Sequence, residues 1–177
     1  MRVIAGKYRG KILKSPKSAN IRPTGDKVKQ ALFTKLQFFI LDTTVLDLFC
    51  GSGALGIEAI SNGAKRVYFV DKDIKSINLT KQNLEGIIED YKILNCDYSV
   101  ALNTIKEQLD LILVDPPYAS GVYEDVLNEI HNKNLLSDEG IVVCEHPKEM
   151  QIKTNKFIMF DKKTYGTVAL SFYRKDV

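Results

Sequence analysis

Residues 45–56 read VLDLFCGSGALG, in which a short apolar run passes directly into a glycine-rich loop. The run is typical of a β-strand buried on both faces, because it carries one charged side chain, Asp47, among large hydrophobic ones. Gly51, Gly53 and Gly56 match the spacing G-x-G-x-x-G. We therefore expect a strand, a tight loop that lets the backbone approach a ligand closely, and a helix.

Short apolar runs alternate with helix-length segments after this loop. The predicted strands are residues 45–49, 67–70, 91–95, 111–114 and 141–144. The predicted helices lie between them, at about 54–62, 74–86, 98–107 and 123–133. This alternation indicates a mostly parallel α/β sheet with right-handed crossovers and helices on both faces. Residues 157–160 and 168–173 flank the turn-rich DKKTYG and predict an antiparallel pair that closes one edge.

Composition and charge indicate a globular protein with a basic N-terminal segment. A chain of 177 residues with 45% hydrophobic residues can bury one sizeable core and is too apolar to be disordered. Residues 1–35 carry ten Lys and Arg against one acid, Asp26, whereas the remainder has a net charge of −6. Such segregation favours a basic surface for a polyanion, either nucleic acid or an anionic membrane, on a neutral-to-acidic body.

The basic N-terminus is predicted to fold. Apolar residues at Val3, Ile4, Ile12 and Leu13 flank a glycine-punctuated stretch, which predicts a short β-hairpin. We expect residues 1–23 to form a basic hairpin and loop, and residues 24–177 to form the main body, which begins with a helix after Pro23.

The cysteines and the apolar runs bear on location. Cys50, Cys96 and Cys144 are odd in number and widely spaced, which predicts packed thiols in a reducing compartment and no zinc site. The first residues lack the apolar run of a signal peptide, and no stretch approaches the length of a membrane span. A cytoplasmic protein without a membrane partner is expected.

Three carboxylates favour an adenosine cofactor. Asp71, 20 residues after Gly51, falls at the end of the second strand, where an acid can accept bonds from ribose hydroxyls. Asp47 would repel a pyrophosphate but attract the amino-acid part or sulfonium charge of S-adenosylmethionine. Asp97 follows the third strand, where it either accepts a bond from an adenine amino group or caps the next helix. The cofactor site therefore comprises Asp47, Gly51, Ser52, Gly53, Asp71 and Asp97.

The tetrapeptide Asp115-Pro116-Pro117-Tyr118 directly follows the fourth strand, at the strand ends that line the ligand crevice. Such a turn suits methylation of an exocyclic amino group, whose nitrogen lone pair is delocalised into the ring. Asp115 and the Pro116 carbonyl can each accept an N–H bond and aim the lone pair at a methyl donor. Tyr118 can stack on the base, which must leave its helix or already be unpaired.

Five motifs, in order and spacing, resemble the RsmD family of 16S ribosomal RNA guanine-N2 methyltransferases. They are MRVIAGKYRGKIL, IRPTGDKVKQALF, LDLFCGSGALGIEAISNGA, VDPPY and YGTVALSFYRK. The resemblance covers nearly the whole chain. It implies a Rossmann-like class I methyltransferase fold with a seven-stranded sheet, S-adenosylmethionine as methyl donor and S-adenosylhomocysteine as product. It also implies, as substrate, ribosomal RNA in an assembling small subunit, and a monomer is expected.

The resemblance carries over to particular residues. Asp47, Gly51 and Gly53 match the family's donor loop, Asp71 its ribose acid, Asp97 its adenine contact and Asp115 to Tyr118 its catalytic turn. The family often has Glu at position 71 and Ala at position 50, so the shorter Asp71 weakens that one assignment. The charge map fits an RNA surface made by Arg2, Lys7, Arg9, Lys11, Arg22 and Lys27.

Other readings stay open. The same turn could serve an adenine-N6 or cytosine-N4 methyltransferase on nucleic acid, or glutamine methylation of a protein. The small body disfavours sequence-specific DNA work, and the basic N-terminus disfavours a protein substrate. The domain could also be a catalytically silent RNA-binding assembly factor, against which the intact Asp115 and glycine loop argue. A dinucleotide-dependent oxidoreductase is disfavoured by Asp47 and the Pro-Pro turn.

Overall fold

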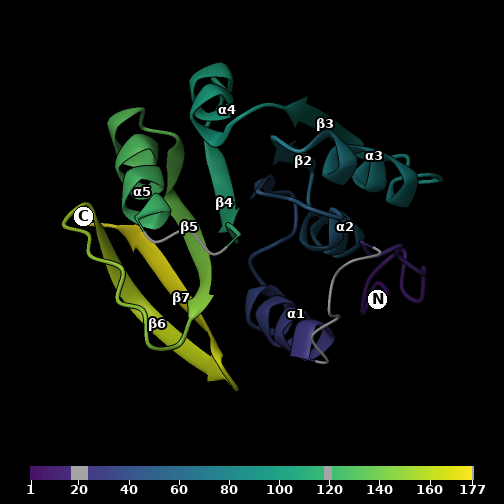
Figure 1. Ribbon diagram of the computed structural model, residues 1–177, viewed down its shortest axis with the longest axis horizontal. Helices are drawn as coiled ribbons and strands as arrows, with labels where there is room; N and C mark the ends of the chain where they lie inside the picture. Colours follow the sequence, from purple (N-terminus) through teal and green to yellow (C-terminus); the bar gives the residue numbers. More distant parts are fainter. Residues whose placement is uncertain (17–23, 118–120, 177) are drawn as a thin grey trace.

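A seven-stranded sheet forms the centre of the computed structural model, which describes residues 1–16, 24–117 and 121–176 (Figure 1). The strands are β1 (Thr44–Leu48), β2 (Arg66–Asp71), β3 (Asp90–Asn95), β4 (Leu109–Val114), β5 (Leu136–Pro147), β6 (Phe157–Tyr165) and β7 (Val168–Lys175). The helices are α1 (Thr24–Leu36), α2 (Ala54–Ser61), α3 (Ile74–Asn83), α4 (Tyr98–Thr104) and α5 (Val122–Asn132).

The strand order is β3-β2-β1-β4-β5-β7-β6. Strands β1 to β5 run parallel, and β7 lies antiparallel to both β5 and β6. The predicted parallel sheet with an antiparallel closing pair is therefore confirmed. The chain order reverses between the neighbouring strands β1 and β4, which is where α/β sheets open a ligand crevice at their carboxyl ends.

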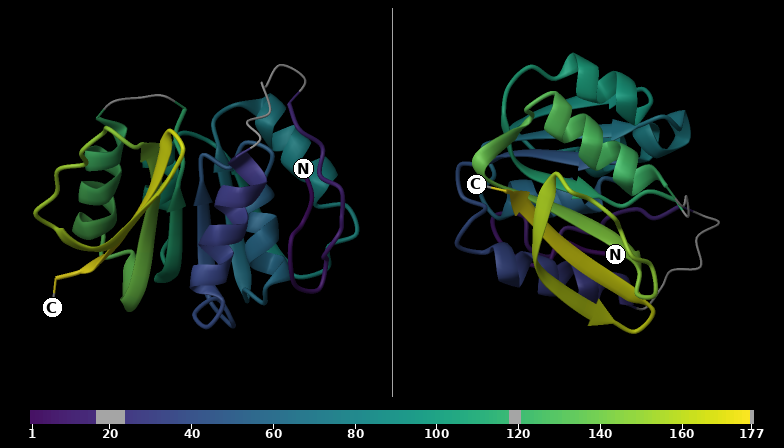
Figure 2. Two further views of the ribbon diagram at one scale, coloured as in Figure 1. Left: turned by 90° about the horizontal axis from the view of Figure 1, so that it is seen from below. Right: turned by 90° about the vertical axis from the view of Figure 1, so that its left-hand side faces the viewer.

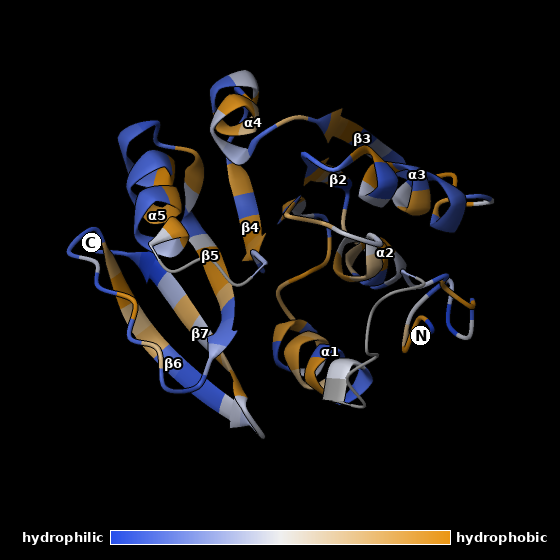
Figure 3. Ribbon diagram, in the orientation of Figure 1, coloured by the Kyte–Doolittle hydropathy of each residue, from blue (hydrophilic) through white to orange (hydrophobic). Residues whose placement is uncertain are grey.

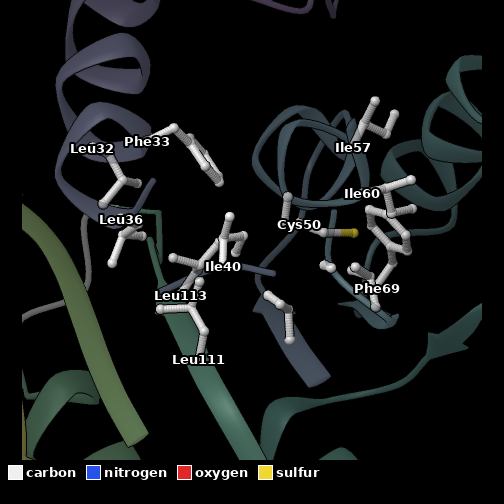
Figure 4. Close-up of a cluster of buried hydrophobic side chains, with 14 of the residues drawn as sticks. Leu32, Phe33, Leu36, Ile40, Cys50, Ile57, Ile60, Phe69, Leu111 and Leu113 are labelled. Carbon is white, nitrogen blue, oxygen red and sulfur yellow. The ribbon is translucent and has the colours of Figure 1, made fainter. Parts of the chain in front are cut away.

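Helices cover both faces of the sheet (Figure 2). Helices α1, α2 and α3 pack on one face in a single cluster, to which Ile77 of α3 belongs. Figure 4 shows Leu36 of α1 and Ile57 of α2 in this cluster with strand residues such as Phe69 and Leu113. Helices α4 and α5 cover the other face, through Leu102 and other buried side chains. Every residue of β1 is buried, as the apolar run predicts for a central strand. The helices accordingly carry a hydrophobic and a hydrophilic side (Figure 3).

The N-terminal residues fold back on themselves, as predicted. Arg2 pairs with Ile12 in an antiparallel bridge, and the Val3 amide donates to the Lys11 carbonyl at 2.9 Å. Val3 and Leu13 are almost fully buried in the same cluster as α1, α2 and α3. The hairpin therefore shares the core of the body. The division of the chain at residue 23 stays a prediction, because residues 17–23 lie outside the described ranges.

Several elements differ from their predicted ends. Phe49, expected to finish the first strand, has a φ of 66° and already belongs to the loop. Helix α3 stops at Asn83, before its predicted end at about residue 86. Strand β6 extends to Tyr165, because the turn needs only Gly166, at a φ of 61°, and Thr167. Among the described helices, none has both the length and the apolar character required to cross a membrane.

Candidate active site

The carboxyl ends of β1 to β4 bring the predicted cofactor and catalytic residues to one edge of the sheet. Leu48, the last residue of β1, pairs with Val70 on one side and Val114 on the other. The glycine loop, Asp71 and the Asp115 turn therefore follow residues that lie side by side across the three strands. Adjacent strands are about 4.8 Å apart, so the loop after β1 and the turn after β4 are close neighbours.

The glycine loop turns sharply through left-handed backbone conformations. The φ angles are 66° at Phe49, 55° at Gly51 and 76° at Gly53, and the Gly53 amide donates to the Cys50 carbonyl at 2.7 Å. A Cβ atom on Gly56 would lie 2.3 Å from the Phe69 ring, so this glycine is required for helix α2 to pack on strand β2. A Cβ on Gly51 would meet nothing within 4 Å. The space beside Gly51 is therefore open to a ligand.

Three side chains from neighbouring elements fix the loop backbone. Asp71 accepts the Gly51 amide at 2.9 Å, and Thr80 of α3 donates to the Gly51 carbonyl at 2.8 Å. Asn83, one turn further along α3, donates to the Ser52 carbonyl at 2.9 Å. Thr80 and Asn83 are both almost fully buried. The loop geometry is therefore determined by residues up to 31 positions away in the sequence.

Asp47 is buried beneath the loop, and its carboxylate accepts the Gly56 amide at 2.8 Å. Burial raises the pKa of this carboxyl from 3.8 to about 7, with the Gly56 hydrogen bond opposing and the charge of Asp71 adding to the shift. The Gly56 amide belongs to the first turn of α2, where a negative charge is favoured. Asp47 thus supports the loop from below, and its direct contact with a donor stays a prediction.

Asp71 and Asp97 stand at the ends of β2 and β3. Asp71 accepts the Asp73 amide at 2.9 Å in addition to that of Gly51. Two bonds leave acceptor capacity on its carboxylate, which offers about four lone-pair positions. Asp97 is exposed and accepts the Ser99 amide at 3.1 Å as the N-cap of α4. The capping role of Asp97 is confirmed, and it is compatible with an adenine contact, because the Ser99 amide and hydroxyl both donate to Oδ1 and a carboxylate has about four lone-pair positions.

An aromatic pair lies beside these carboxylates. The Phe49 and Tyr98 rings are 5.6 Å apart and tilted by 49°. They come from the end of β1 and the start of α4, so they stand at the same edge of the sheet as the glycine loop. Both are half-buried. This edge therefore offers aromatic as well as carboxylate groups to a nucleoside.

The turn at Asp115 follows strand β4, whose residues are almost entirely buried. Asp115 is exposed, Pro116 is buried and Pro117 is exposed, while the predicted stacking residue Tyr118 lies outside the described residues. Tyr123 of α5 was not anticipated in the sequence. Burial raises the pKa of its phenol, and the negative charge of Asp115 raises it further. The Tyr123 hydroxyl donates to the Glu145 carbonyl at 2.6 Å.

His146 has a structural position. Its ring nitrogens bond to the Pro147 carbonyl and the Ser171 hydroxyl, both at 2.8 Å. Because the carbonyl can only accept, Nδ1 carries the proton and Nε2 accepts from Ser171. Burial lowers the pKa of His146, which favours this neutral form.

The predicted RNA-binding residues are divided between two places. Arg2 and Arg9 are exposed on the hairpin. Lys7 forms an ion pair with Glu89 at 2.5 Å, and Lys11 donates to the Glu85 carbonyl at 2.6 Å. Lys27 lies exposed on α1, away from the hairpin, and Arg22 lies outside the described residues. Part of the basic charge of the hairpin is therefore used to attach it to the body.

Two buried charges that the sequence analysis missed anchor the hairpin. Glu58 of α2 is fully buried and accepts the amides of Ile4 and Ala5 at about 3.0 Å. Lys29 of α1, also buried, lies 3.2 Å from the Glu58 carboxylate and donates to the Arg2 carbonyl at 2.6 Å. A lone charge in the otherwise apolar ALGIEAIS was the available signal for Glu58. Similarly, Thr80 and Asn83 are polar residues at core-facing positions of α3.

Comparisons with known proteins agree with this architecture. The family model described as "Conserved hypothetical protein 95" matches residues 1–174. Ribosomal RNA small subunit methyltransferase D of Haemophilus influenzae is 32% identical over 180 residues, which cover 98% of this chain and 93% of that protein. The Escherichia coli (strain K12) protein of the same name is 30% identical over 179 residues, with 99% and 90% covered.

Solved structures show the same fold. The Escherichia coli protein yhhF superposes with a TM-score of 0.87 at 30% identity, covering 99% of this chain and 98% of that one. The rRNA methyltransferase aviRa from Streptomyces viridochromogenes superposes with a TM-score of 0.73 at 15% identity, covering 93% and 90%. The second likeness concerns the fold alone, which is the Rossmann-like class I methyltransferase fold.

Proposed function

Because this chain belongs to the RsmD family, whose model carries the description conserved hypothetical protein 95, we propose that it methylates small-subunit ribosomal RNA. In this proposal the methyl group comes from S-adenosylmethionine, and the acceptor is the exocyclic N2 amine of a guanine in 16S ribosomal RNA. S-adenosylhomocysteine is the second product.

One observation carries the proposal. The glycine loop and the Asp115-Pro116 turn leave adjacent parallel strands at the same level, since Leu48 pairs with Val114. A ligand held over the loop and a base held by the turn would therefore face each other across about one strand spacing. This juxtaposition suits transfer of a small group between two bound molecules.

The loop fits the donor. Gly51 leaves open space for close backbone approach, and Asp71 has acceptor capacity for ribose hydroxyls beside it. Asp97 would receive the adenine amino group, with Ser52 and Gly53 completing the loop and Asp47 supplying negative charge below it. When bound, S-adenosylmethionine supplies an electrophilic methyl carbon next to a sulfonium.

The turn fits the acceptor. The Asp115 carboxylate and the Pro116 carbonyl can each accept one N–H of the guanine amine, which aims its lone pair and stabilises the positive charge that develops on nitrogen. The two prolines restrict the backbone, so little ordering is left for the moment of reaction. The methylated ammonium loses its proton readily, so no strongly basic residue is needed. Tyr118 would stack on the base.

The partner and setting follow from charge and family. Exposed Arg2, Arg9 and Lys27, together with Lys7, Lys11 and Arg22, would contact RNA phosphates. We place the enzyme in the cytoplasm as a monomer that acts on an assembling small subunit. Residues 1–23 would serve as the RNA-binding extension of a methyltransferase domain at 24–177.

Radiolabelled methyl transfer tests the proposal. The purified protein is incubated with labelled S-adenosylmethionine and small-subunit ribosomal RNA from cells that lack this gene, and the RNA is then digested to nucleosides. Labelled N2-methylguanosine is the expected product. Label in N6-methyladenosine or N4-methylcytosine would refute the guanine assignment. RNA binding without any transfer would instead identify a silent assembly factor.

A further inference from the structure

A groove of about 490 Å³ runs between helix α1 and the β6–β7 pair, away from the N-terminal hairpin. Helix α1 borders it with Lys27, Gln30, Ala31 and Thr34, which recur at the spacing of one helix face. The sheet borders it with Lys163, Tyr165 and Phe172. In Figure 1 this helix lies next to the β6–β7 end of the sheet, and Leu170 and Phe172 of β7 belong to the same buried cluster as the helix.

The groove is positively charged. Lys27, Lys35 and Lys163 line it. Asp161 offsets part of this charge, because it pairs with Lys35 at 2.5 Å and lies 3.7 Å from Lys163. Lys35 is additionally held over the Phe172 ring at 5.0 Å. Lys27 and Lys163, both exposed, therefore carry the charge that an anionic partner would meet.

Strand register places the groove level with the catalytic turn. Lys163 pairs with Leu170, and Leu170 pairs with Glu145, which is one residue past Cys144, the partner of Val114. Lys163 on β6 therefore lies at the same position along the strand direction as Asp115, which follows β4. Three strand spacings separate β4 from β6. Three strand spacings amount to about 14 Å. A chain that leaves the target base can reach the groove within a few nucleotides.

The lysines of the hairpin contact the body of the protein instead of lining this groove. Lys7 pairs with Glu89, Lys11 donates to the Glu85 carbonyl and Lys14 donates to the Gln82 side chain at 3.1 Å. These three contacts hold the hairpin against the loop and helix that follow β2. Among the described basic residues of the segment 1–35, Lys27 and Lys35 line this groove.

We propose that this groove, lined by Lys27, Lys35, Lys163, Tyr165 and Phe172, binds the phosphate backbone of a single-stranded RNA segment next to the methylated guanosine. The inference rests on the proposed function for the identity of the polymer. A single strand fits, because a base must be unpaired to reach the turn and the groove opens beside it. Tyr165, half-buried at the β6–β7 turn, gives a ring for a neighbouring base.

Charge reversal with a matched control tests this site. The variant Lys27→Glu with Lys163→Glu is compared with Lys65→Glu with Lys106→Glu. The control lysines are also exposed. They precede β2 and β4, so they lie at the amino ends of the strands, whereas the Asp115 turn lies at the carboxyl ends. Both variants change the net charge by the same amount. A third variant, with Lys27→Arg and Lys163→Arg, keeps the charge and should restore binding. Thermal unfolding of all three checks that they fold.

The probe is small-subunit ribosomal RNA from cells that lack this gene, free or within the subunit. We expect the groove variant to raise the KM for RNA about tenfold, with a smaller change in kcat. We also expect it to reduce the slope of log binding constant against log salt by about 1.4, the value for two phosphate contacts on a single strand. Equal effects in the groove and control variants would overturn the inference. An effect seen only on the subunit would overturn it in favour of a protein occupant.

The proposed function can fail separately. If the unmutated protein binds the RNA but transfers no methyl group, the methyltransferase assignment fails, while the salt slopes still decide whether the groove contacts RNA. If transfer proceeds and the slopes of the two variants coincide, the groove assignment fails alone.

Discussion

The glycine loop at residues 50–53 and the turn at residues 115–117 leave adjacent strands, yet different means hold them. The loop is fixed from outside itself, because Asp71 accepts the Gly51 amide and Thr80 and Asn83 donate to the Gly51 and Ser52 carbonyls. The turn contains two consecutive prolines, which restrict its backbone covalently. The loop is thus organised by tertiary structure, and the turn by local sequence.

Removing the carboxylate from the turn should have the largest effect on activity. We expect Asp115→Ala to lower kcat by about 10²- to 10³-fold, because one preorganised acceptor for the amine is lost. The donor affinity, measured by calorimetry, should change little, since the loop is held separately. The exposed acid Asp138 provides a control as Asp138→Ala. Unchanged turnover in Asp115→Ala would remove this residue from the mechanism.

Breaking the external support of the loop should mainly cost stability. Asn83→Leu removes the bonds to the Ser52 and Lys14 carbonyls and the bond from the Lys14 amide. Because the bonded groups are largely buried, the free energy of unfolding should fall by roughly 2 to 4 kcal/mol, as measured by urea titration. Asn78→Leu, an exposed change on the same helix, should have little effect. A similar loss in both variants would contradict the proposed support.

The buried acid under the loop predicts a pH dependence. The pKa of Asp47 is raised in the folded state to about 7, so its contribution to stability is fully present below pH 4 and is lost as the pH rises to about 7. Asp47→Asn keeps an acceptor for Gly56 and cannot ionise. The difference in unfolding free energy, variant minus wild type, should therefore rise by on the order of 3 kcal/mol between pH 4 and 7. A constant difference would show that Asp47 titrates normally.

Two glycines of the loop have different surroundings: Gly53 packs against a side chain, whereas the space beside Gly51 is open. A Cβ on Gly53 would lie 2.9 Å from the Thr80 methyl carbon, whereas one on Gly51 would meet nothing within 4 Å. Both residues have positive φ, so each alanine costs about 1–2 kcal/mol in backbone strain. Gly53→Ala should therefore lose more thermal stability than Gly51→Ala. Donor binding should nevertheless weaken in Gly51→Ala, and equal donor affinity with the wild type would argue against a ligand beside Gly51.

The stiffness of the turn should have the smallest effect. Pro117→Ala leaves the Asp115 carboxylate and the Pro116 carbonyl in place and frees one backbone torsion. This freedom costs about 1 kcal/mol, so kcat should fall by roughly fivefold. Steady-state kinetics at saturating RNA measures the change. A loss as large as that in Asp115→Ala would mean that the proline does more than stiffen the chain.

The same division explains what the sequence could predict. The strands with continuous apolar runs, the glycine loop and the turn after β4 were predictable, because each is specified by a few consecutive residues. Glu58, Lys29, Thr80 and Asn83 were not, because their partners lie 27 to 69 positions away. The length of β6 was underestimated, since DKKTY reads as a turn although its residues pair with β7 along an exposed edge.

The anchoring of the N-terminal hairpin has a consequence for how the protein is made. Residues 4–8 bind partners that lie between 53 and 82 positions later, at Glu58, Ser61 and Glu89. During translation these residues emerge first, but they find their native contacts only when the chain as far as Glu89 has left the ribosome. The hairpin is thus among the first segments to be synthesised and among the last to reach its native contacts. A nascent intermediate would hold β1, α2 and β2 in place while the backbone amides of residues 4–8 still exchange their hydrogens with water.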